Sequence, residues 1–275
     1  MIKDVLVGLS AAAKRDAAIE FGVSLAETFE AHAAGIAFAL EPVIPATVMG
    51  TLPADIIDAQ RAEHEKIANA ARSRFDRAAG LAGLSFESHV FGTSLAGAAD
   101  RFGRMGRRFD ISVIMQPDPD EDSGNELIVE AAIFQSGRPV VVVPYVHKGG
   151  MTLERVMVCW DGGHAAARAI GDAIPFLERA KSLEVVMVCD PGRQPDSLPG
   201  ADMGQHLARH GVNVEVKTLF SETSVQETLL SFAADISADF IVMGGYGHSR
   251  LREFILGGVT RGMLSSMTVP CLMSH

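Results

Sequence analysis

The stretch "IVMGGYGHSRLREFILGGVTRG", residues 241–262, places two glycine clusters on either side of a basic segment. The first cluster follows an apolar run typical of a buried strand, and the second precedes a run typical of a helix. Glycine lets backbone N–H groups approach a ligand closely, and a helix N-terminus offers unpaired N–H donors with a partial positive charge. The stretch therefore predicts a phosphate site between a strand and a helix.

Two widespread phosphate-binding motifs do not fit this stretch. No lysine follows the glycines that open the helix, which excludes a P-loop. No G-x-G-x-x-G segment opens a helix after the first strand, which argues against a dinucleotide site of the Rossmann type. The basic segment supplies His248, Arg250 and Arg252, which could close over phosphates or form a solvated face.

The chain contains an internal repeat. "KDVLVGLSAAAKRDAAIEFGVSLAETFE" aligns with "ERVMVCWDGGHAAARAIGDAIPFLERAK" at a constant offset of 151, so Ser10 stands at the position of Asp161. Later segments align through Asp110 and Asp239 at an offset of 129. We place the boundary near residue 148, which gives units 1–148 and 149–275.

Each unit alternates short β-rich runs with helical patterns, which predicts βαβ crossovers and a five-stranded parallel sheet with helices on both faces. In such sheets ligands bind outside the carboxyl ends of the strands, where the strand order reverses. Both glycine clusters fall at such an end. The expected strands are residues 5–8, 34–38, 86–90, 111–115 and 140–143 in the first unit and 156–159, 185–189, 214–216, 240–243 and 271–273 in the second.

The glycine spacing resembles the G-2x-G-9x-G-(S/T) loop of the universal stress protein family. Gly244, Gly247 and Gly257 fit it, whereas Gly258 stands where the family has Ser or Thr. "IVMGGYGHSRLREFILGGVTRGMLSSMTVPCLMSH" looks like the family's C-terminal signature, and the repeat resembles its tandem members. The resemblance implies two flavodoxin-like, adenine-nucleotide-binding units.

The resemblance also implies the roles of individual residues. The loop would hold the phosphates of ATP or another adenine nucleotide, with or without Mg. Asp161 would contact the ribose or adenine side, although it could instead be a simple helix cap, and the second strand would lend backbone groups to adenine near Cys189. Thr260 could replace the lost hydroxyl if it faces the site. The predicted binding residues are Asp161, Cys189, Met243, Gly244, Gly247, His248, Gly257, Gly258, Val259 and Thr260.

The first unit departs from the loop pattern. Met115 and Asp118 stand where the second unit has Gly244 and Gly247, and the segment is acidic and contains two prolines. Carboxylates repel phosphates and proline lacks an N–H donor. We therefore expect a degenerate phosphate loop in residues 1–148 and one nucleotide per chain.

Composition narrows the range of partners. The formal net charge of -10 argues against general nucleic-acid binding, and no apolar run reaches the length of a membrane span. The N-terminus lacks a signal-peptide pattern, so we expect a cytoplasmic protein. Cys159, Cys189 and Cys271 show no metal-ligand spacing and are expected in the core, as is Trp160. No metal site or catalytic set is visible.

We expect a nucleotide-binding module in stress signalling with an unknown protein partner, not a dedicated enzyme. Two alternatives stay open: a slow ATP hydrolase, and a scaffold whose nucleotide site has decayed. Residues 140–143 and 271–273 are apolar edge strands that would promote aggregation if exposed. In the family that the chain resembles, units dimerise through their fifth strands. The resemblance therefore implies antiparallel pairing of these two strands in an intramolecular pseudo-dimer, and a homodimer of chains is an open alternative.

Overall fold

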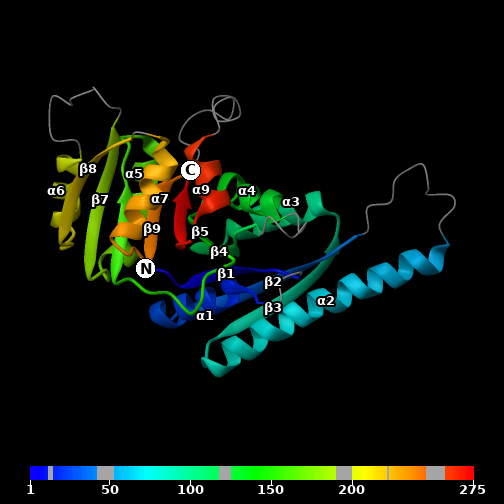
Figure 1. Cartoon of the computed structure of the whole chain (residues 1–275). Coiled ribbons are helices and arrows are strands. Elements are labelled where there is room, and N and C mark those ends of the chain that lie inside the picture. The colour runs from blue at the N-terminus through cyan, green and yellow to red at the C-terminus, as the bar shows by residue number, and fades with distance from the viewer. Residues whose placement is uncertain (12–14, 42–52, 118–124, 190–199, 222, 246–257) are drawn as a thin grey trace. The chain divides into compact units, whose positions relative to one another are not determined.

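The computed structural model describes residues 1–11, 15–41, 53–117, 125–189, 200–221, 223–245 and 258–275. Contacts divide the chain into two compact units, whose elements are labelled in Figure 1. Unit 1 comprises Met1–Arg138 and Lys148–Met151, and unit 2 comprises Pro139–His147 and Thr152–His275. The boundary that the repeat places near residue 148 stays a prediction.

In unit 1 the described strands form a parallel sheet in the order β3-β2-β1-β4. The strand order reverses at β1, because Gly8 lies opposite Ile36 of β2 on one side and Ile114 of β4 on the other. The elements are β1 (Asp4–Leu9), α1 (Ala17–Phe29), β2 (His32–Leu40), α2 (Ala54–Leu81), β3 (Phe86–Thr93), α3 (Leu95–Gly106), β4 (Ile111–Met115) and α4 (Asn125–Gln135).

Unit 2 repeats this arrangement, with strands in the order β5-β10-β9-β6-β7-β8. All described pairs are parallel except β5 with β10, and the strand order reverses at β6. The elements are β5 (Val140–Val143), β6 (Arg155–Cys159), α5 (His164–Leu177), β7 (Ser182–Cys189), α6 (Ala201–Arg209), β8 (Val214–Phe220), α7 (Val225–Asp235), β9 (Phe240–Gly244), α9 (Val259–Ser266) and β10 (Cys271–Ser274). The α/β class predicted from the sequence is confirmed.

The predicted antiparallel pairing of the two apolar strands is also confirmed. Val142 of β5 lies opposite Cys271 of β10, and Val140 lies opposite Met273. Every residue of both strands is buried. The pairing therefore removes two apolar strand edges that would otherwise be open to association.

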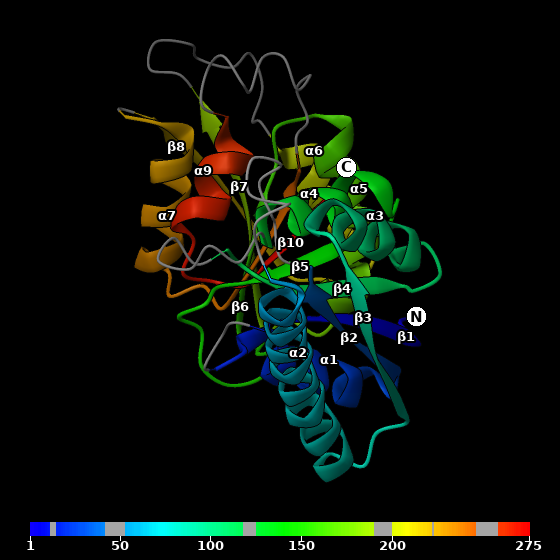
Figure 2. The same ribbon diagram turned by 90° about the vertical axis from the view of Figure 1, so that its right-hand side faces the viewer.

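The long helix α2 packs along β2 and β3, as Figure 2 shows. Its anchor is Phe75, whose side chain is fully buried. Gly35 of β2 makes room for this ring, because a Cβ at Gly35 would lie 2.5 Å from Phe75 Cδ1. The apolar residues of α2 recur at helical spacing at its carboxyl half, where Ala68, Ala71, Phe75 and Ala79 are buried. Among the described residues, no helix has the length and apolar character needed to cross a bilayer.

We expect Phe75→Ala to lower the free energy of unfolding by about 3–5 kcal/mol, because it removes a fully buried ring and leaves a cavity. Urea denaturation measures this directly. Leu81→Ala on the same helix is the matched control, since Leu81 is 85% exposed and its truncation should change stability by less than about 0.5 kcal/mol. Equal effects of the two substitutions would contradict this account of how α2 is held.

Candidate functional site

In unit 2 the carboxyl end of β9 touches the first turn of α5. A Cβ on Gly244 would lie 2.5 Å from the backbone N of Ala166 and 2.7 Å from the backbone C of Ala165. Backbone atoms of a packed helix cannot move aside as the tip of a flexible side chain can. Position 244 therefore excludes a side chain for a packing reason that holds with or without a ligand.

The loop between β6 and α5 carries Asp161. This residue is exposed, and its Oδ1 accepts a hydrogen bond from the N–H of Gly163 at 2.7 Å. Gly162 has a φ of +78°, a left-handed conformation that favours glycine. Gly163 is the N-cap of α5 and makes no side-chain capping bond. The cap residue itself thus offers no side-chain acceptor, and the carboxylate of Asp161 lies beside the start of α5.

The backbone just after β9 is already engaged. Gly245 donates its N–H to the carbonyl of Ser274 at 2.7 Å, and its carbonyl oxygen lies 3.0 Å from His275 Nδ1. Gly244 lies opposite Ser274 in the β9–β10 register. Met243 is 4% exposed, so its side chain belongs to the core. At the strand end, donors for a ligand must therefore come from residues beyond Gly245 or from a helix terminus.

The N-terminus of α9 is such a terminus. Gly258 is its N-cap, with φ −53° and ψ 152° and no side-chain capping bond. The first N–H groups of a helix are not bonded to carbonyls of the same helix. Thr260 is only 2% exposed, so its hydroxyl does not lie on an open surface. The helix packs beside α7 (Figure 2), where a Cβ on Gly262 would collide with Gln226.

Three of the predicted binding residues, Gly247, His248 and Gly257, lie outside the described residues, as do Arg250 and Arg252. Their roles stay predictions. The described members of the predicted set come from four places: the end of β6, the end of β7, the end of β9 and the start of α9. Because β7, β6 and β9 are neighbours in the sheet and parallel, their carboxyl ends meet at one edge.

At the end of β7, the backbone groups of Val188 and Cys189 point in opposite directions. The carbonyl of Val186 accepts from Trp160 N at 2.9 Å, and the carbonyl of Cys189 accepts from Ser221 N at 3.1 Å. Backbone groups of successive strand residues point to alternate sides. The backbone N–H and C=O of Val188 therefore point toward the β6 side of β7. Val188 lies two residues beyond Val186, which forms the last β6–β7 pair with Cys159. Val188, more than Cys189, presents backbone groups toward the strand-end space.

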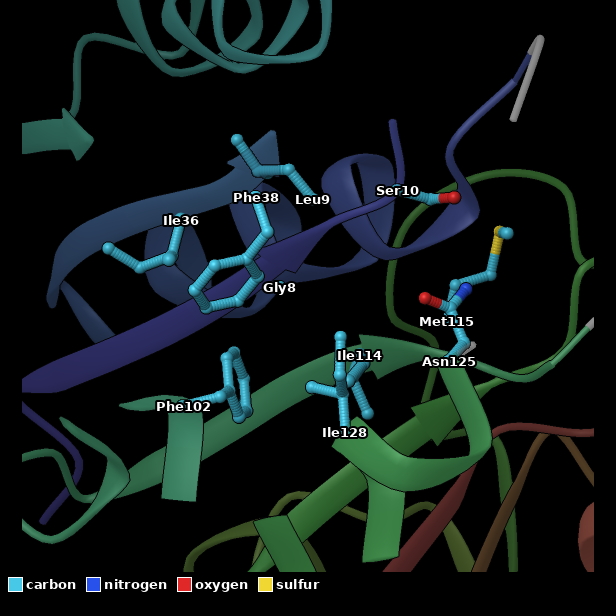
Figure 3. A pocket seen from close by; sticks show the side chains of 10 residues that line it. All are labelled: Gly8, Leu9, Ser10, Ile36, Phe38, Phe102, Ile114, Met115, Asn125 and Ile128. Carbon is cyan, nitrogen blue, oxygen red and sulfur yellow. The ribbon is translucent and has the colours of Figure 1, made fainter. Parts of the chain in front are cut away.

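Unit 1 has a pocket at the corresponding strand ends, which shows which positions of the repeat line this space (Figure 3). The register of unit 1 sets Gly8 beside Ile36 and Ile114, as that of unit 2 sets Cys159 beside Val186. Residues from β1, β2, β4 and α4 that line the pocket include Leu9, Ser10, Phe38, Ile114, Met115 and Ile128.

Carried to unit 2, the first five of these positions become Trp160, Asp161, Val188, Met243 and Gly244. Sequence reasoning expected Trp160 in the core and named Cys189 rather than Val188 at the second strand. The signal for Trp160 was the repeat itself, which aligns it with Leu9 at the offset of 151. Val188 could not be distinguished from Cys189 without the hydrogen-bond pattern of β7.

The two units differ at the helix that follows their first strand. In unit 1 the N-cap of α1 is Asp16, whose carboxylate accepts from Ala18 N at 3.1 Å and from Ser10 N at 2.7 Å. A carboxylate of the chain thus occupies the end of α1 that would otherwise attract an anion. Burial raises the pKa of Asp16 from 3.8 to about 6, and hydrogen bonds from Ser10 and Ala18 act in the opposite direction.

Burial makes the thiols of Cys159 and Cys271 poor nucleophiles. Burial raises the pKa of the Cys159 thiol to about 12, with a smaller contribution from Asp161, and burial raises that of Cys271 well above its ordinary value. The reactive thiolate is therefore disfavoured at neutral pH. Within the described part of the chain, no cluster of three or more His, Cys, Asp or Glu residues is arranged to hold a metal ion.

Part of the chain matches a known family. Residues 152–275 match the model of the Universal stress protein family. The universal stress protein Slr1230 of Synechocystis sp. is 24% identical over 150 residues, or 52% of this chain. The chain spans about half the length, 49%, of that curated relative. These findings support a universal stress protein, and the family match begins at residue 152.

Solved structures extend the similarity of fold over the whole chain. A universal stress protein from Archaeoglobus fulgidus DSM 4304 has a TM-score of 0.67 at 16% identity, covering 98% of this chain and 95% of that one. A protein of unknown function from Pseudomonas aeruginosa PAO1 has a TM-score of 0.57 at 12% identity, covering 99% and 92%. At these identities the likeness shows the fold alone.

The close approach at Gly244 gives a stability prediction. We expect Gly244→Ala to lower the free energy of unfolding by about 1–3 kcal/mol, since the added methyl group meets helix backbone. Gly171→Ala within α5 is the matched control, because nothing lies within 4 Å of its added Cβ. That control should be neutral or stabilise by up to about 1 kcal/mol. Thermal unfolding of both variants checks the contrast, and a tolerated alanine at 244 would contradict it.

The buried Asp16 gives a pH prediction. Its pKa in the folded protein is about 6, above the ordinary 3.8, so between these values the folded state binds a proton that the unfolded chain does not. The contribution of Asp16 to stability therefore rises as pH falls from about 7 to about 4, by an amount of order 3 kcal/mol. Asp16→Asn lacks this titration. Chemical denaturation of both proteins at several pH values measures their free energies of unfolding. The value for the wild type should rise relative to that of the variant as pH falls, and a difference that is constant with pH would refute the assignment to Asp16.

Proposed function

We propose that unit 2 binds one adenine nucleotide, ATP or a relative, and that the chain acts as a nucleotide-dependent binding module in the stress response. The observation that carries the proposal is the N-terminus of α9, where Gly258 caps the helix without a side-chain bond, in the unit whose strand end at Gly244 lies against the start of α5. Helix termini of this kind can bind phosphates through backbone N–H groups and their partial positive charge.

The proposed roles combine the family resemblance with the local geometry. The phosphates would meet the N–H groups that follow Gly258, together with Gly247, His248 and Gly257 of the glycine loop. The exposed carboxylate of Asp161 would accept hydrogen bonds from the ribose. Mg²⁺, if bound with the nucleotide, would reduce the repulsion between this carboxylate and the phosphates.

Adenine would pair with the backbone of Val188 at the end of β7, where Cys189 has its carbonyl engaged by Ser221. Trp160 is half-buried at the end of β6, in the position where Leu9 lines the pocket of unit 1. We therefore place the indole of Trp160 at the wall of the nucleotide site. Trp160 is also the chain's single tryptophan, which makes its fluorescence a direct report on that wall.

The first half is proposed to be a second copy of the unit that has lost the nucleotide site. Asp16 occupies the N-terminus of α1 with its own carboxylate, Met115 stands where unit 2 has Gly244, and Phe38 stands where unit 2 has Val188. Each change removes a donor, a space or a favourable charge that a nucleotide would use. Two tandem universal-stress-like units would then carry different tasks.

Asp161→Ala should weaken nucleotide binding by about 10- to 100-fold, the usual cost of removing a charged hydrogen-bond partner, about 1–3 kcal/mol. Ser10→Ala is the matched control, because Ser10 holds the same position in unit 1. Titration of ATP, ADP and AMP against Trp160 fluorescence gives the dissociation constants, with equilibrium dialysis as a probe-independent check. An equal loss of nucleotide affinity in both variants would show that Asp161 does not contact the nucleotide. If none of the three nucleotides binds the unmutated protein, the scaffold alternative is favoured.

A further inference from the structure

The strand β3 forms the outer edge of the unit 1 sheet, since among the described strands it pairs only with β2. The N–H of Ala33 bonds the carbonyl of Ser85, and the N–H of Glu41 bonds that of Thr93. Backbone groups of the odd-numbered residues therefore face β2, and those of the even-numbered residues face outward. The outward residues are Phe86, Ser88, Val90 and Gly92. Such an edge is a template for a further strand.

A second copy of β3 can pair with this edge in an antiparallel arrangement about a two-fold axis. If the axis passes through Ser88, this residue lies opposite Ser88 of the second copy, and Phe86 lies opposite Val90 of the second copy. Outward backbone groups then meet outward backbone groups, as an antiparallel ladder requires. In this register Glu87 lies opposite His89 of the second copy, and the same pair occurs again on the other side of the axis.

The charges of β3 select this register over its neighbours. Side chains directly opposite each other have Cβ atoms about 5 Å apart, so an acidic and a basic group attract and like groups repel. An axis at Glu87 would set two glutamates against each other, and an axis at His89 would set two histidines against each other. Within one chain His89 Nε2 already lies 3.4 Å from Glu87 Oε2, and the second copy extends this pair into a row of four side chains.

The flank of α2 beside β3 has the same self-complementarity. Arg74 bonds the carbonyl of Ser10 just beyond β1, so it lies on the flank that faces β1. Arg72 and Asp76 are each two residues from Arg74, about 200° around the helix, and therefore lie on the flank that faces β3. Among the described residues neither forms an ion pair, and the Oδ1 atom of Asp76 is buried without a hydrogen-bond partner.

The position of Phe75 brings this flank to the same two-fold axis. Its ring lies against Gly35, and Gly35 lies opposite Ser88 in the β2–β3 register. An axis at Ser88 therefore passes at the level of Phe75, close to the midpoint between Arg72 and Asp76. Strands lie about 4.8 Å apart, so a helix above β2 and β3 (Figure 2) comes about 10 Å from its symmetry mate, the spacing of packed helices. Arg72 of each copy then meets Asp76 of the other.

We propose that the β3 edge and the adjoining flank of α2 form a homodimer interface, in which two copies of this chain pair their β3 strands antiparallel about Ser88. Exposed charges on an edge strand usually keep strands apart. Here they attract in the one register that also joins the helices. The side chain of Phe86, whose residue is 36% exposed in the single chain, becomes covered opposite Val90. The interface belongs to unit 1 and does not depend on nucleotide binding by unit 2.

Charge variants on α2 test the interface through sedimentation velocity of the full chain. The wild type should sediment as a dimer at tens of micromolar. Asp76→Arg sets arginine against arginine and Arg72→Asp sets aspartate against aspartate, so each variant alone should dimerise at least about tenfold more weakly. An equimolar mixture of the two variants should form a heterodimer with restored affinity, because every charge then meets its opposite. Restored dimerisation also shows that both variants are folded.

The matched control is Asp235→Arg at the end of α7 in unit 2, an exposed position with the same change of charge. This variant should dimerise like the wild type. A monomeric wild type would overturn the proposal, as would an Asp76→Arg variant that dimerises with unchanged affinity. A mixture that associates no more strongly than its two components would overturn it as well.

The register on β3 is tested by exchanging its charges. Glu87→His sets histidine against histidine and should weaken dimerisation by about two- to tenfold. The double variant Glu87→His with His89→Glu places acid and base opposite each other again, so its affinity should return toward that of the wild type. Equal affinities of the single and double variants would show that β3 does not pair about Ser88.

Discussion

The candidate site of unit 2 depends on the contact between the end of β9 and the first turn of α5. Gly244 has no side chain, so the strand end lies directly against the backbone of Ala165 and Ala166. Gly163 caps the helix without a side chain, and the exposed carboxylate of Asp161 accepts a hydrogen bond from the N–H of Gly163. The reversal of strand order at β6 brings these features to one edge of the sheet.

Unit 1 has the same topology with a different helix end. Asp16 fills the N-terminus of α1 with a carboxylate, and the strand-end space is lined by aromatic and aliphatic groups. The two units thus differ at one helix end without a change of topology. A scaffold that holds ligands at its strand ends can change ligand chemistry by substitution at a few positions there.

Much of the fold could be read from the sequence, because the repeat and the buried β-rich runs indicate two units in which parallel strands alternate with helices. The pairing of β5 with β10 was predictable for a similar reason, since two apolar edge strands must be covered. Fewer features of the candidate site could be predicted from the sequence. The packing role of Gly244 depends on how close α5 lies, and the choice of Val188 over Cys189 depends on which strand each carbonyl faces. Neither the distance between β9 and α5 nor the direction of a carbonyl group can be derived from the spacing of residues along the chain.

The two copies of the fold are proposed to differ in nucleotide binding, so the number of nucleotides bound per chain is the decisive quantity. Isothermal titration calorimetry would be run with ATP, ADP and AMP at protein concentrations well above the dissociation constant, where the equivalence point counts sites. The account predicts a single equivalence point at one nucleotide per chain. Two nucleotides per chain would contradict it, because unit 1 would then have kept an anion site despite Asp16.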